Sequence, residues 1–201
     1  RFAEQILPDQ LHILNVSFLV PSLRREYGGC AGNIAYSLQQ LGGTALPVAT
    51  VGNDGADYLA RFKALGISTQ HVVLQSDSYT AQAMIMTDRD NNQITAFHPG
   101  AMAQAHLNPL NPSADVTLGI ISPDGREAMM SHAREFAQAG IPFVFDPGQG
   151  LPMFNGAELR EFLDLATWVT VNDYEGKMLC ERTGLDFAAI SYLCKGVLVT
   201  L

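Results

Sequence analysis

The fold is decided by three segments, FVFDPGQ at residues 143–149, WVTVNDYE at 168–175 and GVLVTL at 196–201. Each begins with a short apolar run that is typical of a buried β-strand, and the stretches between them have the periodicity of helices. Strands that alternate with helices form parallel sheets, because a covering helix returns the chain to the same end of the sheet. The sequence therefore predicts an α/β fold, a three-layer αβα sandwich with a mostly parallel sheet.

The same alternation extends toward the N-terminus. Strands are expected at 45–51 and 116–122. Glycines mark the ends of the helices between them, as they commonly do after the last helical turn. The expected helices are one after Asn33 that closes at Gly42–Gly43, one from Gly55 to Gly66, and one that Asp124 can cap and that ends at Ala139.

Two regions depart from this alternation. Thr80–Met86 and Gln93–His98 are typical of the two strands of a hairpin around a polar loop. Leu11–Val20 has the alternating pattern of a further strand. We expect residues 1–28 and 79–100 to supply the strands of a small separate β layer, and residues 29–78 and 101–201 to form the α/β core.

Composition excludes several classes of protein. Lys and Arg number 12 against 20 Asp and Glu, so the formal net charge is −8, which argues against binding to nucleic acid or to an anionic membrane surface. No apolar run approaches the roughly 18 residues of a membrane span. The three cysteines are far apart and in no ligand spacing, so we expect reduced thiols and a cytoplasmic protein.

The ends of the sequence suggest that the chain is truncated on both sides. It starts with Arg1 and stops within an expected buried strand. Chain termini normally lie at the surface, beyond the last element of the fold.

Polar residues follow each of the three strands that decide the fold. They are Asp146 to Gln149, Asn172 to Glu175, and Thr200. Ligands of open α/β sheets bind beyond the carboxyl ends of the strands, so these groups are candidates for a binding site. Each also has a structural explanation as a turn, a helix cap or a strand residue. Asn155 and Glu158 have the same spacing as Asn172 and Glu175, but they stand where a helix should begin and predict a cap.

The glycine-rich turn Gly28–Asn33 is a second candidate. It matches neither G-x-G-x-x-G nor the P-loop pattern, so a nicotinamide-dependent oxidoreductase is not favoured. A turn of this kind lets the backbone approach a ligand in front of a helix N-terminus, with the Asn33 amide available to hydroxyl groups. The alternative is a tight turn that requires glycine for its geometry alone. The histidines have no metal-ligand spacing.

Together these motifs resemble the ribokinase (PfkB) family of sugar and nucleoside kinases over nearly all of the chain. FHPGAM and DPGQ are most similar to the bacterial adenosine kinase branch. The motifs that carry the resemblance are, in order, GGCAGNIAYSLQQLGG at 28–43, VGNDGADYLARFKALGI at 51–67, TAQAMIMTDRDNNQITAFHPGAM at 80–102, FVFDPGQ at 143–149 and VNDYEGKML at 171–179.

The resemblance implies a ribokinase-like fold with a lid over the sugar site. It also implies transfer of the γ-phosphate of ATP to a primary hydroxyl of a nucleoside or sugar, with adenosine preferred. The substrate-binding residues that it implies are Gly29 and Asn33 for the sugar hydroxyls, and Ser17, Phe97 and Gln149 near the base.

For the second substrate, the resemblance implies that Asn172 and Glu175 organise water around Mg²⁺ and the phosphates, and that Thr200 lies at the start of the ATP site. The family's Gly-Ala-Gly-Asp signature, which carries the general base and the anion hole, has no match in this sequence. The resemblance therefore implies an incomplete core without the C-terminal ATP-binding portion, and no catalytic residue in this chain.

Two other functions stay open. One is a non-catalytic protein of the same fold that binds a sugar or nucleoside, and the other is a sugar kinase of the ribokinase or fructokinase type. In each case the expected partner is a small molecule rather than nucleic acid or a membrane. An exposed edge of the lid could also pair with a second copy to form a homodimer.

Overall fold

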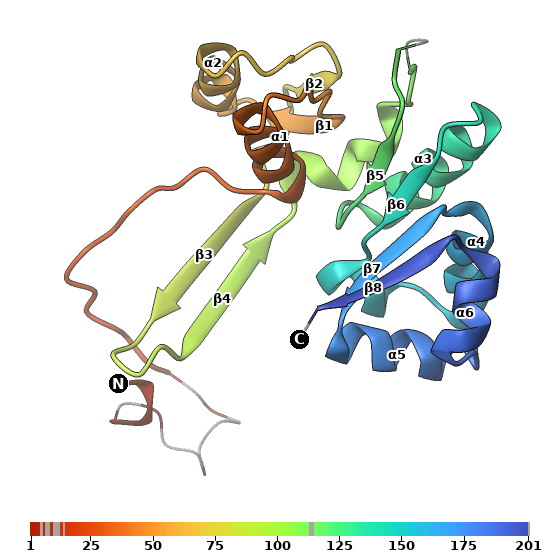
Figure 1. Ribbon diagram of the computed structural model, residues 1–201. Helices are drawn as coiled ribbons and strands as arrows, with labels where there is room; N and C mark the ends of the chain where they lie inside the picture. The colour runs from red at the N-terminus through yellow and green to blue at the C-terminus, as the bar shows by residue number, and fades with distance from the viewer. Residues whose placement is uncertain (5, 7–8, 10–12, 14, 113–114, 201) are drawn as a thin grey trace.

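The computed structural model describes residues 1–4, 6, 9, 13, 15–112 and 115–200. Its main sheet has four parallel strands in the order β5-β6-β7-β8 (Figure 1). The strands are β5 (Gly119–Ile121), β6 (Phe143–Phe145), β7 (Trp168–Asn172) and β8 (Gly196–Thr200). The helices that connect them are α3 (Arg126–Gln138), η4 (Gly148–Met153), α4 (Gly156–Leu165), α5 (Asp173–Thr183) and α6 (Phe187–Leu193). The predicted α/β fold is confirmed.

The core of the molecule lies between this sheet and its helices. Phe143, Phe145 and Val169 point to the same face and are almost fully buried, and the rings of Phe145 and Phe162 stack with centroids 4.2 Å apart. Successive strand residues point to opposite faces, so the alternate positions lie on the other side. There Ile120, Trp168 and Leu198 are 43%, 38% and 63% exposed. Among the described residues, burial is therefore concentrated on one face of the sheet.

A smaller unit precedes the main sheet. Two parallel strands, β1 (Ala49–Gly52) and β2 (Val72–Gln75), pack near α1 (Cys30–Gln40) and α2 (Ala56–Ala64). The sequence predicted β1 and both helices but not β2. In the described part of the chain, no helix combines the length and apolar character needed to cross a membrane.

The buried side chain of Asn108 joins the two units. Asn108 follows η3 (Gly100–Leu107). Its side-chain amide nitrogen donates to the backbone oxygens of Ala49, at 3.1 Å, and His71, at 2.9 Å. The backbone oxygen of Asn108 lies 2.9 Å from Nε2 of His132 on α3. One residue thus holds the β1–β2 pair against the helix that covers β5.

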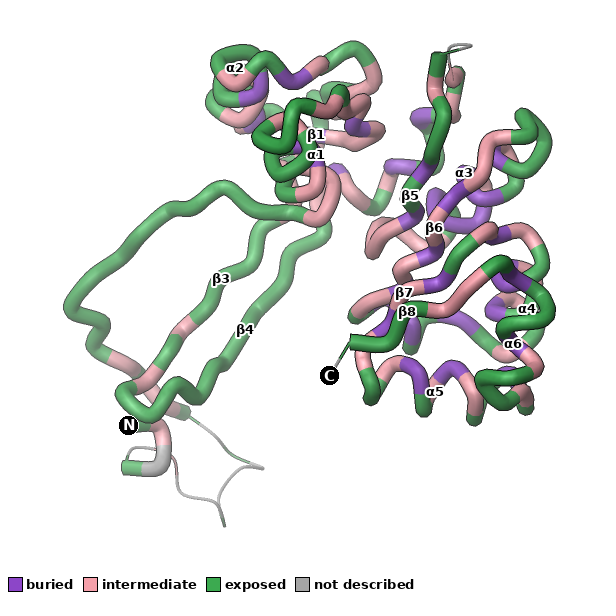
Figure 2. The backbone as a smooth tube through the Cα atoms, viewed as in Figure 1, coloured by how far each residue is buried: buried purple, intermediate pink, exposed green. Residues whose placement is uncertain are grey.

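The predicted hairpin is confirmed, but the predicted early strand is wrong. Strands β3 (Gln82–Thr87) and β4 (Gln93–His98) pair antiparallel and stand away from the core, exposed along most of their length (Figure 2). Residues 15–20, within the predicted strand 11–20, form no strand, and residues 11, 12 and 14 lie outside the described part. Leu19 in this segment is 98% exposed. An alternating pattern forms a strand only where a neighbouring backbone is available to pair with it.

The base of the hairpin is fixed to the loop after β1. Oδ1 of Asp54 accepts hydrogen bonds from the backbone N–H and the hydroxyl of Thr80, both at 2.7 Å, and Oδ2 accepts one from Gln82 at 3.0 Å. The donors on Thr80 lower the pKa of Asp54. A Cβ at Gly52 would collide with the backbone of residues 78–80, so the close approach of the two segments requires glycine there.

Helices α4 and α5 begin with the same capping box. Oδ1 of Asn155 accepts a hydrogen bond from the backbone N–H of Glu158, and Oε2 of Glu158 accepts one from the backbone N–H of Asn155. Asn172 and Glu175 repeat this arrangement, with both distances at 2.8 Å. The sequence predicted a cap for the first pair and left a cap open, beside a binding role, for the second. The predicted cap of α3 by Asp124 is wrong, because Gly125 is the N-cap and the Asp124 carboxylate accepts from Gly125 N–H instead.

We expect Asp54→Ala to lower the free energy of unfolding by about 1 kcal/mol, because the donors on Thr80 lose a charged acceptor. Since the folded pKa of Asp54 is lowered, its contribution is present above the unfolded pKa and is lost as the pH falls through the folded value. Urea unfolding at neutral and acidic pH measures both effects. Asp77→Ala, at an exposed position, is the matched control. Equal midpoints for the two variants would contradict the expectation.

We also expect Asn155→Ala and Asn172→Ala to lower the free energy of unfolding by similar amounts, about 1 kcal/mol each, through the loss of a helix cap. Urea titrations of the two variants beside Asn111→Ala, which changes an exposed loop residue, provide the comparison. A normal midpoint for Asn172→Ala alone would show that its capping box does not stabilise α5.

Candidate functional site

The carboxyl ends of three neighbouring strands line one edge of the main sheet. Asp146 directly follows β6, and Asn172 and Thr200 are the last residues of β7 and β8, where they lie opposite each other in the parallel register. The sequence-based prediction that these groups share an edge is confirmed. Asp124 lies in the loop after β5, at the same end of the sheet.

The glycine-rich turn forms the start of α1. Gly29 is the N-cap residue, with φ 94° and ψ 142°, a conformation that glycine adopts far more readily than other residues. Its backbone oxygen accepts from Asn33 N–H at 3.0 Å. The Asn33 side chain is exposed, and within the described residues it has no hydrogen-bond partner in the protein. Its amide is therefore available to an external group.

Electrostatic effects indicate that the glycine-rich turn lies near the strand ends. Burial raises the pKa of the Cys30 thiol, and the carboxylates of Asp146 and Asp124 raise it further. Burial also raises the pKa of Asp146, and the nearby Glu175 carboxylate adds to that effect. Because charges influence one another strongly only at short range, the first residue of α1 lies close to the ends of β5 and β6, and Asp146 lies close to the start of α5.

Gln149 lies beside this region, on the loop after β6. Gly148 precedes it with φ 45°, and a Cβ at Gly148 would lie 2.7 Å from Cγ of Pro123. The loop thus packs tightly against the loop after β5, which requires glycine at 148. Gln149 itself is exposed.

The two lid residues of the prediction have different outcomes. Phe97 lies on β4 opposite Ala83, with its ring 52% exposed. Ser17 is exposed and does not lie on a lid strand, so its predicted strand position is wrong. The contact of both side chains with a base stays a prediction.

The side chains expected near Mg²⁺ have oxygen atoms that a cation could bind. Oε2 of Glu175 accepts the Asn172 N–H, which leaves its second oxygen to other partners. Repulsion from Glu175 raises the pKa of Asp146, and a cation between the two carboxylates would relieve it. Mg²⁺ prefers such oxygen ligands and retains several waters. The two carboxylates fit such a cation by their chemistry, and the described residues contain no cluster of three or more metal-ligating side chains.

Three residues near the site were missed by the sequence analysis. Asp124 could have been found from its place after a predicted strand, but it was interpreted as a helix cap. Asn108 and Tyr58 carry no motif, and their contacts are with residues distant in sequence.

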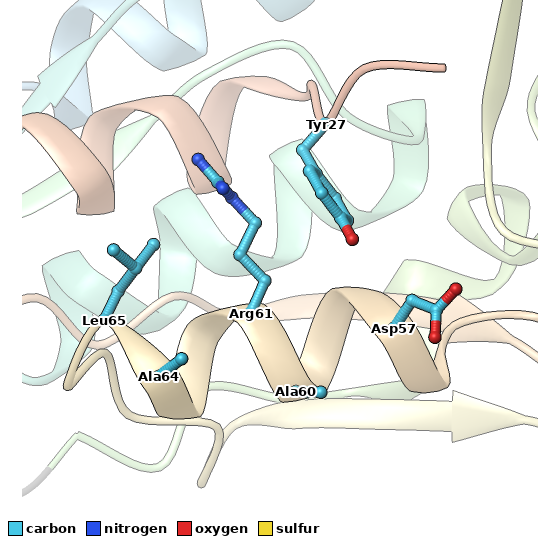
Figure 3. Close-up of a pocket in the computed structure, with 6 residues that line it drawn as sticks. All are labelled: Tyr27, Asp57, Ala60, Arg61, Ala64 and Leu65. Atoms are coloured by element: carbon cyan, nitrogen blue, oxygen red, sulfur yellow. The ribbon is translucent and has the colours of Figure 1, made fainter.

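A hollow of about 440 Å³ lies beside α2, lined by Tyr27, Asp57, Ala60, Arg61, Ala64 and Leu65 (Figure 3). None of the predicted site residues lines it. It is distinct from the strand ends.

The structure closely matches that of a nucleoside kinase from Burkholderia thailandensis in complex with inosine. The TM-score is 0.88 at 52% identity, and the match covers 100% of this chain and 64% of the other. A complex of the same kinase with ADP-inosine matches at TM-score 0.85 and 55% identity, over 100% of this chain and 63% of the other.

A nucleoside kinase from Methanothermobacter thermautotrophicus is 28% identical over 193 residues, which are 92% of this chain and 61% of the relative. The chain thus spans less than two thirds of the length of these proteins. The model for pfkB family carbohydrate kinases matches residues 5–200, and on that match the chain belongs to this family.

Proposed function

We propose that the chain is the nucleoside-binding part of an ATP-dependent nucleoside kinase, cytoplasmic in location. The observation that carries the proposal is the edge of the main sheet where Asp146, Asn172 and Thr200 follow or end neighbouring strands, and the effect of Asp146 and Asp124 on the pKa of Cys30 indicates that the glycine-rich turn lies near this edge. Membership of the pfkB family and similarity to a kinase crystallised with inosine support it.

The nucleoside would bind between the turn and the strand ends. Gly29 exposes its backbone, since a Cβ there would meet no other atom, and the exposed Asn33 amide can both donate to and accept from ribose hydroxyls. Gln149 and Phe97 would contact the base, with Ser17 nearby. We propose a purine nucleoside with adenosine preferred; a sugar kinase of the ribokinase type is the alternative.

The phosphates would bind farther along the same edge of the sheet. Asn172 and Thr200 are adjacent at the ends of β7 and β8, and the start of α5 presents backbone N–H groups that favour anions. Glu175 and Asp146 would hold Mg²⁺ partly through water, and the ion would supply positive charge to the phosphate oxygens. Positioning of this kind provides most of the catalysis in phosphoryl transfer.

The chain contains no Gly-Ala-Gly-Asp sequence to supply a general base. General bases typically contribute about 10²- to 10⁴-fold to rate, so we propose that these 201 residues alone bind nucleoside without appreciable turnover. Thermal shift with adenosine, inosine, ribose and fructose tests the binding. A shift with ribose or fructose but with neither nucleoside would favour the sugar kinase.

The lid also suggests a homodimer. Strands β3 and β4 pair only with each other among the described residues, so their outer edges are open to pairing with a second copy. Sedimentation velocity over a range of concentrations tests this, and a monomer throughout would refute it.

We expect Asn33→Ala to weaken nucleoside affinity by about 1–3 kcal/mol, because ribose hydroxyls lose their hydrogen-bond partner. Calorimetry with adenosine and inosine measures the effect. Asn111→Ala, at an exposed position outside the proposed site, should bind like the parent chain. An unchanged Kd for Asn33→Ala would remove this residue from the site.

In the complete kinase, we expect Glu175→Gln to raise the Mg²⁺ concentration needed for half-maximal phosphorylation of nucleoside. The reason is that Glu175, one of the two carboxylates proposed to hold Mg²⁺ with Asp146, loses its charge. Glu158→Gln changes the matched capping box on α4 and controls for loss of the cap. Identical Mg²⁺ titrations for the two variants would assign Glu175 a structural role only.

A further inference from the structure

Tyr58 on α2 contacts the glycine-rich turn directly. Its hydroxyl donates to the backbone oxygen of Gly28 at 2.6 Å. Gly28 immediately precedes Gly29, whose positive φ sets the direction of the turn. The Tyr58 side chain is half-buried, and its burial raises the pKa of the phenol, so the hydroxyl keeps its proton and remains a donor at neutral pH.

The same hydroxyl also contacts the far side of the turn. A Cβ at Gly32, on the first turn of α1, would collide with the Tyr58 hydroxyl oxygen, and Cζ of the ring would lie 3.2 Å away. Glycine at 32 is therefore required for the approach of α1 to Tyr58. The hydroxyl lies between residues 28 and 32 and fixes the spacing of the two ends of the turn.

Two further side chains hold the segment that leads into the turn. The ring of Tyr27 packs edge-on against Tyr58, with centroids 5.5 Å apart. The Arg61 guanidinium lies 4.8 Å from the centroid of the Tyr27 ring, a cation–π contact, and Figure 3 shows the two side chains together at the hollow beside α2. We call Tyr27, Tyr58 and Arg61 the α2 clasp.

We infer that Tyr58 is a positioning residue for substrate binding, and that the α2 clasp holds residues 28–33 in the conformation that presents Gly29 and Asn33 to the nucleoside. This inference rests on the proposed function. Tyr58 contacts the turn and not the reacting atoms, so its loss should weaken nucleoside binding and leave the chemical step unaffected.

The test is Tyr58→Phe, which removes the hydroxyl and keeps the ring in the small core around Phe62. Tyr192→Phe is the matched control, because Tyr192 is 90% exposed on α6. Inosine and adenosine binding is measured by calorimetry. We expect Kd to increase about 2- to 10-fold for Tyr58→Phe, as for the loss of one neutral hydrogen bond, and to be unchanged for Tyr192→Phe.

Cys30, the residue after Gly29, gives a second readout that needs no nucleoside. In a Cys180→Ser background the other thiol, Cys194, is buried, so the rate of alkylation by iodoacetamide reports on Cys30. We expect this rate to rise several-fold in Tyr58→Phe, because the turn opens more often. In the complete kinase, KM for nucleoside should rise while kcat is retained, a division that a merely destabilised protein would not show.

A double variant tests the contact with Gly32. Gly32→Ala alone places a methyl group against the Tyr58 hydroxyl and should weaken nucleoside binding more than Tyr58→Phe does. With the hydroxyl removed, the nearest ring atom would be Cζ at 3.2 Å, which small shifts can relieve. We therefore expect Tyr58→Phe to recover part of the binding lost in Gly32→Ala.

The outcomes separate this inference from the proposed function. If the parent chain binds neither nucleoside, the proposed function fails, and the Cys30 rate alone decides whether the α2 clasp holds the turn. An unchanged Cys30 rate in Tyr58→Phe overturns the inference whatever binds. A faster alkylation of Cys30 with an unchanged Kd for nucleoside also overturns the inference. Tyr58 would then hold the turn without any effect on nucleoside binding.

Discussion

The arrangement of the whole chain depends on the buried amide of Asn108. Its side chain donates to Ala49 in β1 and to His71, the residue before β2, and its backbone oxygen lies within hydrogen-bond distance of His132 on α3. Hydrogen bonds of this kind are strengthened in a low-dielectric interior, and leaving any member without a partner is costly. The β1–β2 unit therefore has a defined position against the main sheet, and the start of α1, which packs with that unit, has a defined position near the strand ends.

The candidate site combines two glycine-dependent loops with repulsion between carboxylates. Glycines at 29 and 148 allow two loops to take conformations and approaches that other residues would resist. Near them, the carboxylate of Glu175 repels that of Asp146, in a chain that already carries a net charge of −8. A nucleotide would be repelled by such a surface at long range. Local N–H donors and a cation must offset that repulsion. The starts of α1 and α5, which lie at this end of the sheet, present such N–H groups.

The sequence was most informative where local patterns decide the structure. The alternation of strands and helices predicted the main sheet, and the hairpin of β3 and β4 followed from its polar loop. The strand expected at 11–20 failed at residues 15–20, because a pattern specifies a face but not a partner. Asn155 and Asn172 both form the capping box that their shared spacing favours. They differ in that Asn172 is also the last residue of a strand of the main sheet, and its site role stays a prediction.

Contacts between distant residues were beyond prediction. Tyr58 and Gly28 are 30 residues apart, and Asn108 and Ala49 are 59 apart. An aromatic residue on an amphipathic helix is typical of a core position, and nothing in its neighbours indicates that its hydroxyl holds a turn. The convergence of the glycine-rich turn with the strand ends was expected only through the family resemblance, and the coupling of Cys30 to Asp146 is its physical counterpart in the structure.

Strand β8 is paired on one side only, with β7, among the described residues. Its other side presents a row of backbone donors and acceptors next to the exposed Leu198 and Val199, which makes it a template for strand addition. A parallel strand added there would finish beside Thr200, and whatever loop came after it would enlarge the proposed phosphate region. Where no strand covers it, this edge of β8 favours self-association of the chain. Low protein concentrations should therefore keep the chain monomeric.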